Sequence, residues 1–187
     1  MKFILMLKLS LITVFLMVIE SGLNTVWRDG QLLAKNPTYT INKEDQFLSN
    51  ARQLTFEGRR SGEGYFSSDG SQMIFQSERE IGNPFFQIYL MTLKTGRVHR
   101  VSPGYGKTTC GWIAPDGQKV LFASTHADSD SIKKQQKELQ IRASGQNRRY
   151  TWDFDEHFDI YESDQQGNYL KKLTDSQGYD AEASWSP

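Results

Sequence analysis

The chain has 187 residues, with 22 basic and 22 acidic side chains and a formal net charge of zero. This balance offers no basic footprint for nucleic acid, and the length suits one domain. The single cysteine, Cys110, excludes an internal disulfide. Aromatic residues make up 12% of the chain, a share that favours packed β-sheets.

The first 21 residues have the pattern of an export signal. Lys2 and Lys8 precede an uncharged, mainly apolar run at residues 9–19. This run suits a signal-peptide core of about 7–15 residues and is short for a membrane-spanning helix, which needs about 20. We expect residues 1–21 to be a cleaved signal peptide or, alternatively, an N-terminal membrane anchor. Either interpretation places the protein outside the cytoplasm, in the periplasm or beyond the cell.

Residues 22–50 are predicted to be a linker, because a proline at position 37 and the polar run at 42–45 disfavour a compact helix. The remainder of the chain is built from a repeated unit. A shift of 47 positions, which carries Ser68 to Pro115, aligns residues 52–77 with 99–124 without a gap. A further shift of 72 positions, which carries Pro115 to Pro187, aligns the first part of the unit, residues 99–115, with residues 171–187. Self-similarity of this length indicates a repeat architecture.

Each unit predicts four short antiparallel strands. Two Asp-Gly turns, at positions 69–70 and 116–117, suit tight hairpins, because glycine accepts a positive φ. Strand-forming residues lie on both sides of each turn and recur twice more downstream. The expected strands lie at 65–66, 73–75, 86–89 and 98–101 in the first unit and at 112–113, 120–122, 158–161 and 170–173 in the second. Four strands in about 45 residues is the pattern of a β-propeller blade.

The motif xxLT…(S/A)xDGxxΦΦFxS…xIYxxxxxG resembles the TolB-like blade, the WD40-like PD40 repeat, and covers residues 51–187. The resemblance implies a β-propeller, usually six-bladed, found in exported bacterial proteins and at the front of some peptidases. We therefore expect an all-β fold of two complete blades and the start of a third, as a fragment of a six-bladed ring.

Two blades do not make a ring, and this has consequences for the surfaces. Residues 51–56 are expected to form an outer strand whose partner belongs to a closing blade, because unpaired sheet edges are otherwise a liability. The outward faces of the two blades are expected to stay apolar and exposed.

The second unit carries an insertion at residues 127–151, between its second and third strands. Residues 131–143 are predicted to form a short helix that ends before Gly145. The insertion holds six basic and three acidic residues, and four acidic residues follow at 152–159. It is interpreted either as a solvated arm folded against an acidic rim or as an arm that binds a partner.

Four alternating polar residues after the insertion are weak candidates for metal ligands. Their spacing would place carboxylates and an imidazole on one face of a strand, where a hard cation is bound; a polar face at a blade edge explains the alternation equally well. The residues are Asp153, Asp155, His157 and Asp159.

Three residues share one position in the repeat. Glu63, Cys110 and Glu182 align at the start of the inner strand, next to the expected ring centre, with Asp180 nearby. The carboxylates either line a channel mouth that binds a cation or basic peptide, or they cap backbone donors between blades. Cys110 is expected to be a buried small residue rather than a nucleophile.

No nucleophile elbow, P-loop or zinc-protease motif occurs, so we predict neither a catalytic residue nor a cofactor. The sequence favours an exported, non-catalytic scaffold that binds a protein or peptide through the loop face of the propeller. The alternative is the N-terminal propeller of a larger prolyl-oligopeptidase-type or other peptidase. The residues expected on the binding face are Arg59, Arg60, Lys107, His126, Arg148, Arg149, Tyr179 and Asp180.

Overall fold

The computed structural model describes residues 25–28, 31–34, 47–146 and 154–186, and the predicted signal segment lies outside them. The chain divides into two compact units, Met1–Ala51 and Arg52–Pro187. In the first unit, β1 (Thr25–Arg28) and β2 (Gln31–Ala34) form an antiparallel hairpin that the sequence analysis did not predict. Within the described part of the chain, no helix has the length and apolar character to span a membrane.

The second unit begins with a four-stranded antiparallel sheet, here called blade one. Its strands are β3 (Arg60–Phe66), β4 (Gln72–Glu78), β5 (Gln87–Thr92) and β6 (Arg97–Arg100), and they are neighbours in chain order. The predicted Asp-Gly turn joins the first two strands. Gly70 has a φ of 68° and donates its N–H to the Ser67 carbonyl at 2.9 Å, as the tight hairpin requires.

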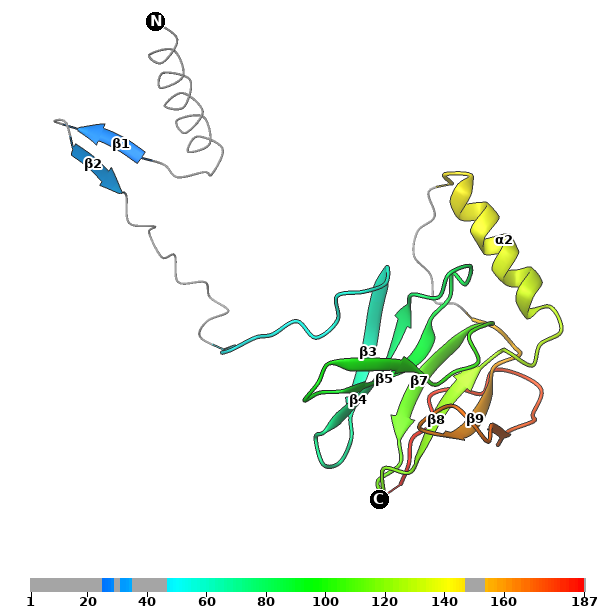
Figure 1. Cartoon of the computed structure of the whole chain (residues 1–187). Helices are drawn as coiled ribbons and strands as arrows, with labels where there is room; N and C mark the ends of the chain where they lie inside the picture. The colour runs from blue at the N-terminus through cyan, green and yellow to red at the C-terminus, as the bar shows by residue number, and fades with distance from the viewer. Residues whose placement is uncertain (1–24, 29–30, 35–46, 147–153, 187) are drawn as a thin grey trace, which may run out of the picture. The chain divides into compact units, whose positions relative to one another are not determined.

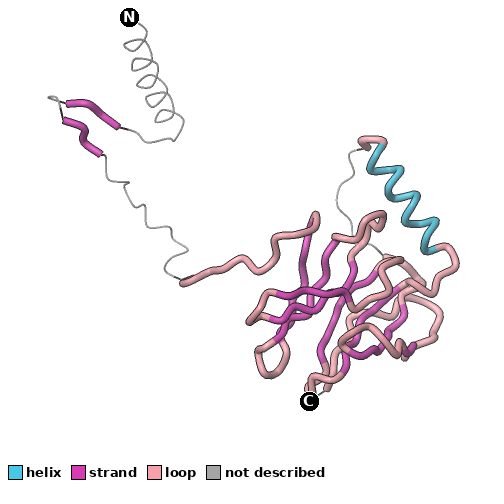
Figure 2. Tube along the Cα trace, in the orientation of Figure 1, coloured by secondary structure: helices cyan, strands magenta, loops and turns pink. Residues whose placement is uncertain are grey.

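Blade two repeats this arrangement. Its strands β7 (Thr108–Ile113), β8 (Lys119–Ser124), β9 (Asp159–Asp164) and β10 (Lys171–Lys172) again pair antiparallel in chain order. Helix α2 (Ser131–Ala143) lies in the connection between β8 and β9, with the bounds that the sequence predicted. Figure 1 shows the two sheets, and Figure 2 shows α2 lying outside them. The predicted fold class, antiparallel four-stranded propeller blades, is confirmed.

The inner strand of each blade carries the same β-bulge. The pairing register shifts between Gly62 and Tyr65 in blade one and between Thr109 and Trp112 in blade two. A residue in the left-handed region lies within each bulge, Glu63 with φ 43° and Cys110 with φ 53°. The equivalent residue of the third unit, Glu182, has φ 64°. Positive φ is unusual for these residue types, so its return at one repeat position shows that the third unit starts as an inner strand does.

The two blades pack face to face around one apolar core. Blade one contributes Ile74, Ile88 and Leu90, and blade two contributes Val120 and Phe122 among others. Side chains alternate between the faces of a strand, so each blade buries every second residue in this layer.

Gly111 of β7 lies at the tightest point of this layer. A Cβ atom there would lie 2.9 Å from Cγ2 of Ile88 and 3.0 Å from Cγ1 of Ile74. Only glycine therefore allows the inner strand of blade two to approach blade one this closely.

The Leu-Thr part of the motif has a structural role at the outer strand. In blade one, Val101 donates its N–H to the Ile88 carbonyl at 2.9 Å, and the Ser102 hydroxyl accepts the Ile88 N–H at 2.9 Å. In blade two, Leu173 and Thr174 make the same two bonds to Ile160, at 2.8 and 3.0 Å. The hydroxyl thus satisfies a buried backbone donor where the outer strand ends.

Residues 51–56 do not form the outer strand that was expected. Among the described residues, this segment pairs with no strand of either sheet. Leu54 nevertheless packs against blade one, at the repeat position that Val101 occupies against blade two.

The expectation of exposed outward faces is wrong for most of their area. On blade two, Ala183 and Trp185 of the third unit pack over Leu121 and Ile160. On blade one, Met73 and Phe75 are buried under Leu54 and nearby side chains. Leu54 comes from the segment before blade one, whereas Leu93 and Val98, which also pack there, belong to blade one, and Phe66 stays 62% exposed.

Candidate functional site

Helix α2 is fixed across the loop ends of both blades. Gln135, which is buried, accepts the Gly106 N–H at 2.7 Å and donates to the Gly82 carbonyl at 3.3 Å. Gly106 lies in the connection between the blades, and Gly82 lies in the β4–β5 loop. The insertion therefore opens on the same face as the blade-to-blade connection.

The C-terminal end of α2 is tied to blade one by an arginine. Arg142 pairs with Glu78 at 2.5 Å and donates to the Pro84 carbonyl at 2.8 Å. Its Nε also donates to the carboxylate of Glu138, one turn earlier in the helix, at 2.9 Å. Glu78 pairs in turn with Arg60 at 2.9 Å, so the helix, the β4 end and the start of β3 share one ionic network.

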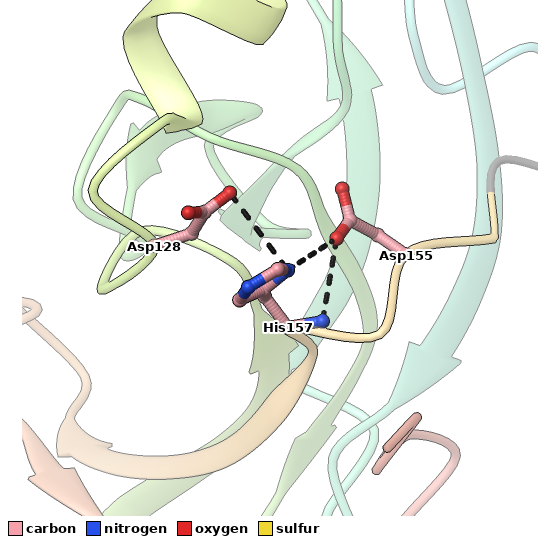
Figure 3. Close-up of side chains that lie close together, drawn as sticks. All are labelled: Asp128, Asp155 and His157. Carbon is pink, nitrogen blue, oxygen red and sulfur yellow. Dashed lines mark hydrogen bonds and ion pairs between the residues drawn. The ribbon is translucent and has the colours of Figure 1, made fainter. Parts of the chain in front are cut away.

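The N-terminal end of α2 is tied to blade two by a lysine. The Lys134 ammonium lies 2.8 Å from Oδ1 of Asp155 and 2.7 Å from Oδ2 of Asp128. The side chains of both aspartates are about 95% buried, at 5% and 4% exposure. Figure 3 shows these carboxylates on either side of the His157 imidazole, whose Nδ1 lies 3.1 Å from Asp155.

The charges in this cluster stabilise one another. Burial alone raises the pKa of Asp155, but hydrogen bonds from Lys134 and His157 outweigh it and hold that pKa below its ordinary value. Burial likewise opposes the ionisation of Asp128, and the Lys134 hydrogen bond again leaves the pKa lowered. Lys134 has a raised pKa for the reciprocal reason, because its two carboxylate partners outweigh its own burial. Asp128, Asp155 and Lys134 are therefore all ionised at neutral pH.

The predicted metal ligands are only partly brought together. Of the four, Asp155 and His157 come together, and their oxygen and nitrogen atoms lie within 4.8 Å of one another and of Asp128, which was not predicted. The Lys134 ammonium already supplies the positive charge between the two carboxylates, which favours an internal ion pair over a metal. Asp159 instead pairs with Lys172 at 3.0 Å, and Asp153 lies outside the described residues.

Asp155 and His157 do not share a strand face with Asp159, because β9 starts only at Asp159. A turn precedes the strand, in which Phe158 donates its N–H to the Asp155 carbonyl at 3.3 Å. This turn brings the side chains of Asp155 and His157 next to Lys134 of α2.

A cleft of about 540 Å³ lies between α2 and the segment before β9. Its apolar lining comes from Phe85, Ile141 and Phe154, and Phe154 is 65% exposed. The cleft is flanked by Lys137 of the helix and Glu156 of the opposite segment, and both side chains are exposed. Exposed aromatic and apolar surface between charged rims is typical of a protein-binding site.

Most residues predicted for the binding face are held by partners within the chain. Arg60 stacks 4.2 Å over Phe86, and Lys107 pairs with Asp155 at 3.4 Å. Tyr179 stacks on Phe154 and Asp180 accepts a bond from Ser176. Arg59 is exposed, whereas Arg148 and Arg149 lie outside the described residues.

His126 lies beside a hydroxyl in a pattern that resembles a catalytic pair. Its Nδ1 lies 2.9 Å from Oγ of Ser124, and burial lowers the pKa of the imidazole. Ser124 is 0% exposed, however, and the imidazole packs against Tyr161 at 4.3 Å between ring centroids. The hydroxyl has no exposed surface in this structure, so the pair is interpreted as structural.

The three residues aligned at the inner strand do lie near one another. The Cys110 thiol lies 3.5 Å from Glu63, and Glu182 is close enough to affect its ionisation. Burial, with an added effect of these carboxylates, raises the pKa of the Cys110 thiol to about 11. A thiol with this pKa is almost fully protonated at neutral pH and is a poor nucleophile.

Sequence reasoning missed the residues that anchor the helix. Asp128, Lys134 and Gln135 were treated only as parts of a charged arm, and Glu78 was not singled out. A glutamine on a short, weakly amphipathic helix gives no signal of burial, because its partners are backbone groups of another blade.

No protein-family model and no curated protein matches this chain. Among solved structures, it is similar to a candidate TolB of Agrobacterium tumefaciens, with 19% identity over 66% of this chain and 33% of that chain, at a TM-score of 0.45. It is also similar to TolB of Acinetobacter baumannii, with 24% identity over 71% of this chain and 26% of that chain, at a TM-score of 0.48. A GH74 enzyme of Niastella koreensis matches at 12% identity over 60% of this chain and 14% of that chain, with a TM-score of 0.32. The chain spans a third or less of the length of each of these structures.

Proposed function

We propose that this chain is an exported, non-catalytic propeller module that binds another protein through the face carrying α2. The observation that carries the proposal is the docking of α2 over the loops of both blades, beside the cleft with the exposed Phe154. A helix fixed at both ends presents its surface with little loss of conformational entropy on binding. Rigid scaffolds commonly carry binding surfaces on such loops.

The chemistry of the cleft supports a protein or peptide as the ligand. Phe154 and Ile141 offer apolar contact, while Lys137 and Glu156 place opposite charges on its two sides. This combination matches an amphipathic segment better than a phosphate or nucleic acid, because acidic and basic groups are mixed around the cleft. Export is proposed from the apolar run at residues 9–19.

Photo-crosslinking from the cleft tests this proposal. A photoreactive phenylalanine analogue is placed at Lys137 or at Glu156, and the protein is produced in the source cells, irradiated and fractionated. We expect both positions to give the same discrete adduct, and we expect it in the exported fraction.

The matched control for this experiment places the analogue at Gln118, an exposed residue in the β7–β8 turn outside the cleft. The proposal is overturned if Gln118 gives the same adduct, or if neither cleft position gives one. Recovery of the adduct from the cytoplasmic fraction would instead contradict the export part alone.

A further inference from the structure

The two Asp-Gly turns of the repeat share one backbone arrangement. Asp69 and Gly70 lie between β3 and β4, and Asp116 and Gly117 lie between β7 and β8. Both glycines have a positive φ, 68° for Gly70 and 70° for Gly117. Each also donates its N–H to the carbonyl three residues earlier, at 2.9 and 2.8 Å. A difference in behaviour between the turns must therefore come from their side chains.

In blade one, the aspartate side chain of the turn is held by two serines. The Asp69 carboxylate accepts the Ser67 hydroxyl at 2.6 Å and the backbone N–H of Ser71 at 3.0 Å. The Ser71 hydroxyl lies 2.9 and 2.8 Å from its two oxygens. The Ser67 hydroxyl, followed by the two Ser71 groups, lowers the pKa of Asp69 to about 2.

Blade two lacks both of these hydroxyl groups. Ala114 and Gln118 stand 47 positions after Ser67 and Ser71, at the same places in the repeat. Within the described part of the chain, the Asp116 carboxylate accepts one hydrogen bond, from the backbone N–H of Gln118 at 2.9 Å. The residue is exposed, so its side chain is far less restrained than that of its counterpart.

We propose that Asp116 is a site of spontaneous covalent modification, at which the chain rearranges to isoaspartate, and that the two serines protect Asp69 from the same reaction. The nitrogen of Gly117 forms a bond to Cγ of Asp116 and gives up its proton. The carboxyl oxygen leaves as water, so a cyclic succinimide remains. Water then opens the ring, and opening at the main-chain carbonyl leaves Gly117 attached through the former side chain. The reaction needs water alone, with no enzyme and no oxidant.

The hydrogen bonds determine which turn reacts. The ring forms only when the carboxylate leaves its partners and turns towards the nitrogen of the next residue. Bonds to ionised groups are the strong ones, so each of them opposes this rotation. Asp69 has to leave both serines, whereas Asp116 has to leave one N–H. A protonated carboxyl also loses water more readily, and the lowered pKa of Asp69 makes that form rarer.

The modification would alter a contact between the blades. The Gly117 carbonyl accepts Nε2 of Gln165 at 2.6 Å, and Gln165 exchanges bonds with Gln72 of blade one at 2.9 and 3.0 Å. The Pro115 carbonyl accepts the Ser68 hydroxyl of blade one at 2.7 Å. Isoaspartate adds one carbon to the main chain between these two carbonyls. We therefore expect the reaction to loosen the contact at this end of the blades.

Timed incubation of the full chain at physiological temperature and pH, followed by trypsin digestion, tests the proposal. The fragments 61–79 and 108–119 separate the two sites, and each contains one aspartate and no asparagine. Isoaspartate in each fragment is measured by labelling with isoaspartyl methyltransferase. We expect it to form at least about tenfold faster in 108–119, because fewer hydrogen bonds must break there. In protein unfolded by urea, the two rates should become alike, because a glycine follows both aspartates.

Reciprocal substitutions at one repeat position test the protecting role of serine. Ser71→Gln gives blade one the residue of blade two and should speed the reaction in fragment 61–79. Gln118→Ser makes the reverse change and should slow the reaction in fragment 108–119. Both positions are exposed, so the fold should be retained, which circular dichroism checks.

Opposite changes of rate in the two variants support the proposal. It is overturned if fragment 108–119 of the folded protein reacts no faster than fragment 61–79, or if neither fragment gains isoaspartate. A difference that persists unchanged in urea, or rates that neither substitution alters, would also overturn it.

Discussion

Replacing Gly111 with alanine should lower the free energy of unfolding by about 1–3 kcal/mol, the usual cost of adding a methyl group to a filled core. The new Cβ would lie 2.9 Å from Ile88 and 3.0 Å from Ile74, both of them buried between the blades. The blades would have to move apart or the isoleucines would have to leave their rotamers. Urea unfolding followed by circular dichroism measures the loss.

The matched control is Gly64→Ala, at the same repeat position in blade one. Its Cβ lies 3.1 Å from the flexible end of Met73 and 3.8 Å from Phe75, so a change below about 0.5 kcal/mol is expected. Both variants are compared at low protein concentration, so that self-association does not add to stability. Equal losses for the two substitutions would show that the blades do not stack at Gly111.

Replacing Lys134 with methionine should release α2 from the loop face. The substitution leaves the buried carboxylate of Asp128 without its ammonium partner, whereas Asp155 loses Lys134 and keeps Lys107, at 3.4 Å. Breaking a fully buried pair costs about 3–5 kcal/mol, and less is expected here because Lys134 is 34% exposed. A 13-residue helix is marginal by itself, so this loss should appear as local undocking. Hydrogen exchange of residues 131–143 should become about 10–100-fold faster while the amides of β4 and β8 stay protected.

Lys133→Met is the control for the same helix, because Lys133 is 80% exposed and lies 3.9 Å from Asp130. Its exchange should match that of the natural sequence. Unchanged protection in Lys134→Met would contradict the anchoring role of the cluster.

The pH dependence of α2 docking follows from the same contacts. Folding lowers the pKa of Asp128 and Asp155, so their contribution is complete above the ordinary value of 3.8 and is lost as the pH falls through the lowered values. In the natural protein, the exchange protection of α2 should therefore fall on acidification below pH 3.8. In Lys134→Met this acid-dependent loss should be smaller, because both carboxylates have already lost Lys134 and only Asp155 keeps an ammonium partner, Lys107.

The repeat alone was enough to predict the blade architecture. Asp-Gly turns at equivalent positions, with apolar strands on both sides, constrain local backbone and burial together, and both blades follow them. Helix α2 was equally predictable, since Glu138 and Arg142 do pair and Gly145 ends the helix with φ 70°. In each case the determining contacts are close in sequence.

The bulges were not predicted, although their positions were noticed. Glu63 and Cys110 have no propensity for positive φ, so nothing in their residue type signals the conformation. The bulge is a property of how the inner strand pairs with its neighbour. Residues 51–56 were wrongly predicted as a strand for a related reason, because strand formation depends on a pairing partner.

The candidate site depends on contacts that are distant in sequence, and here prediction was weakest. The alternation of polar residues in the sequence suggested that Asp155, His157 and Asp159 act together. Only Asp159 lies in β9, however, because the strand begins at that residue, and Asp155 and His157 lie in the turn before it. Lys134 reaches Asp155 across 21 positions and Arg142 reaches Glu78 across 64. The charge pattern alone does not specify such pairs, because any basic residue of the insertion is a possible partner for an acidic one.

Proton–proton distances by nuclear magnetic resonance test the stacking of the two blades most directly. The account predicts strong cross-peaks between the α-protons of Gly111 and the methyl groups of Ile74 and Ile88, since those methyl-bearing side chains fill the space above the glycine. Contacts of these methyl groups with blade-one residues only, and none with Gly111 or Phe122, would contradict it.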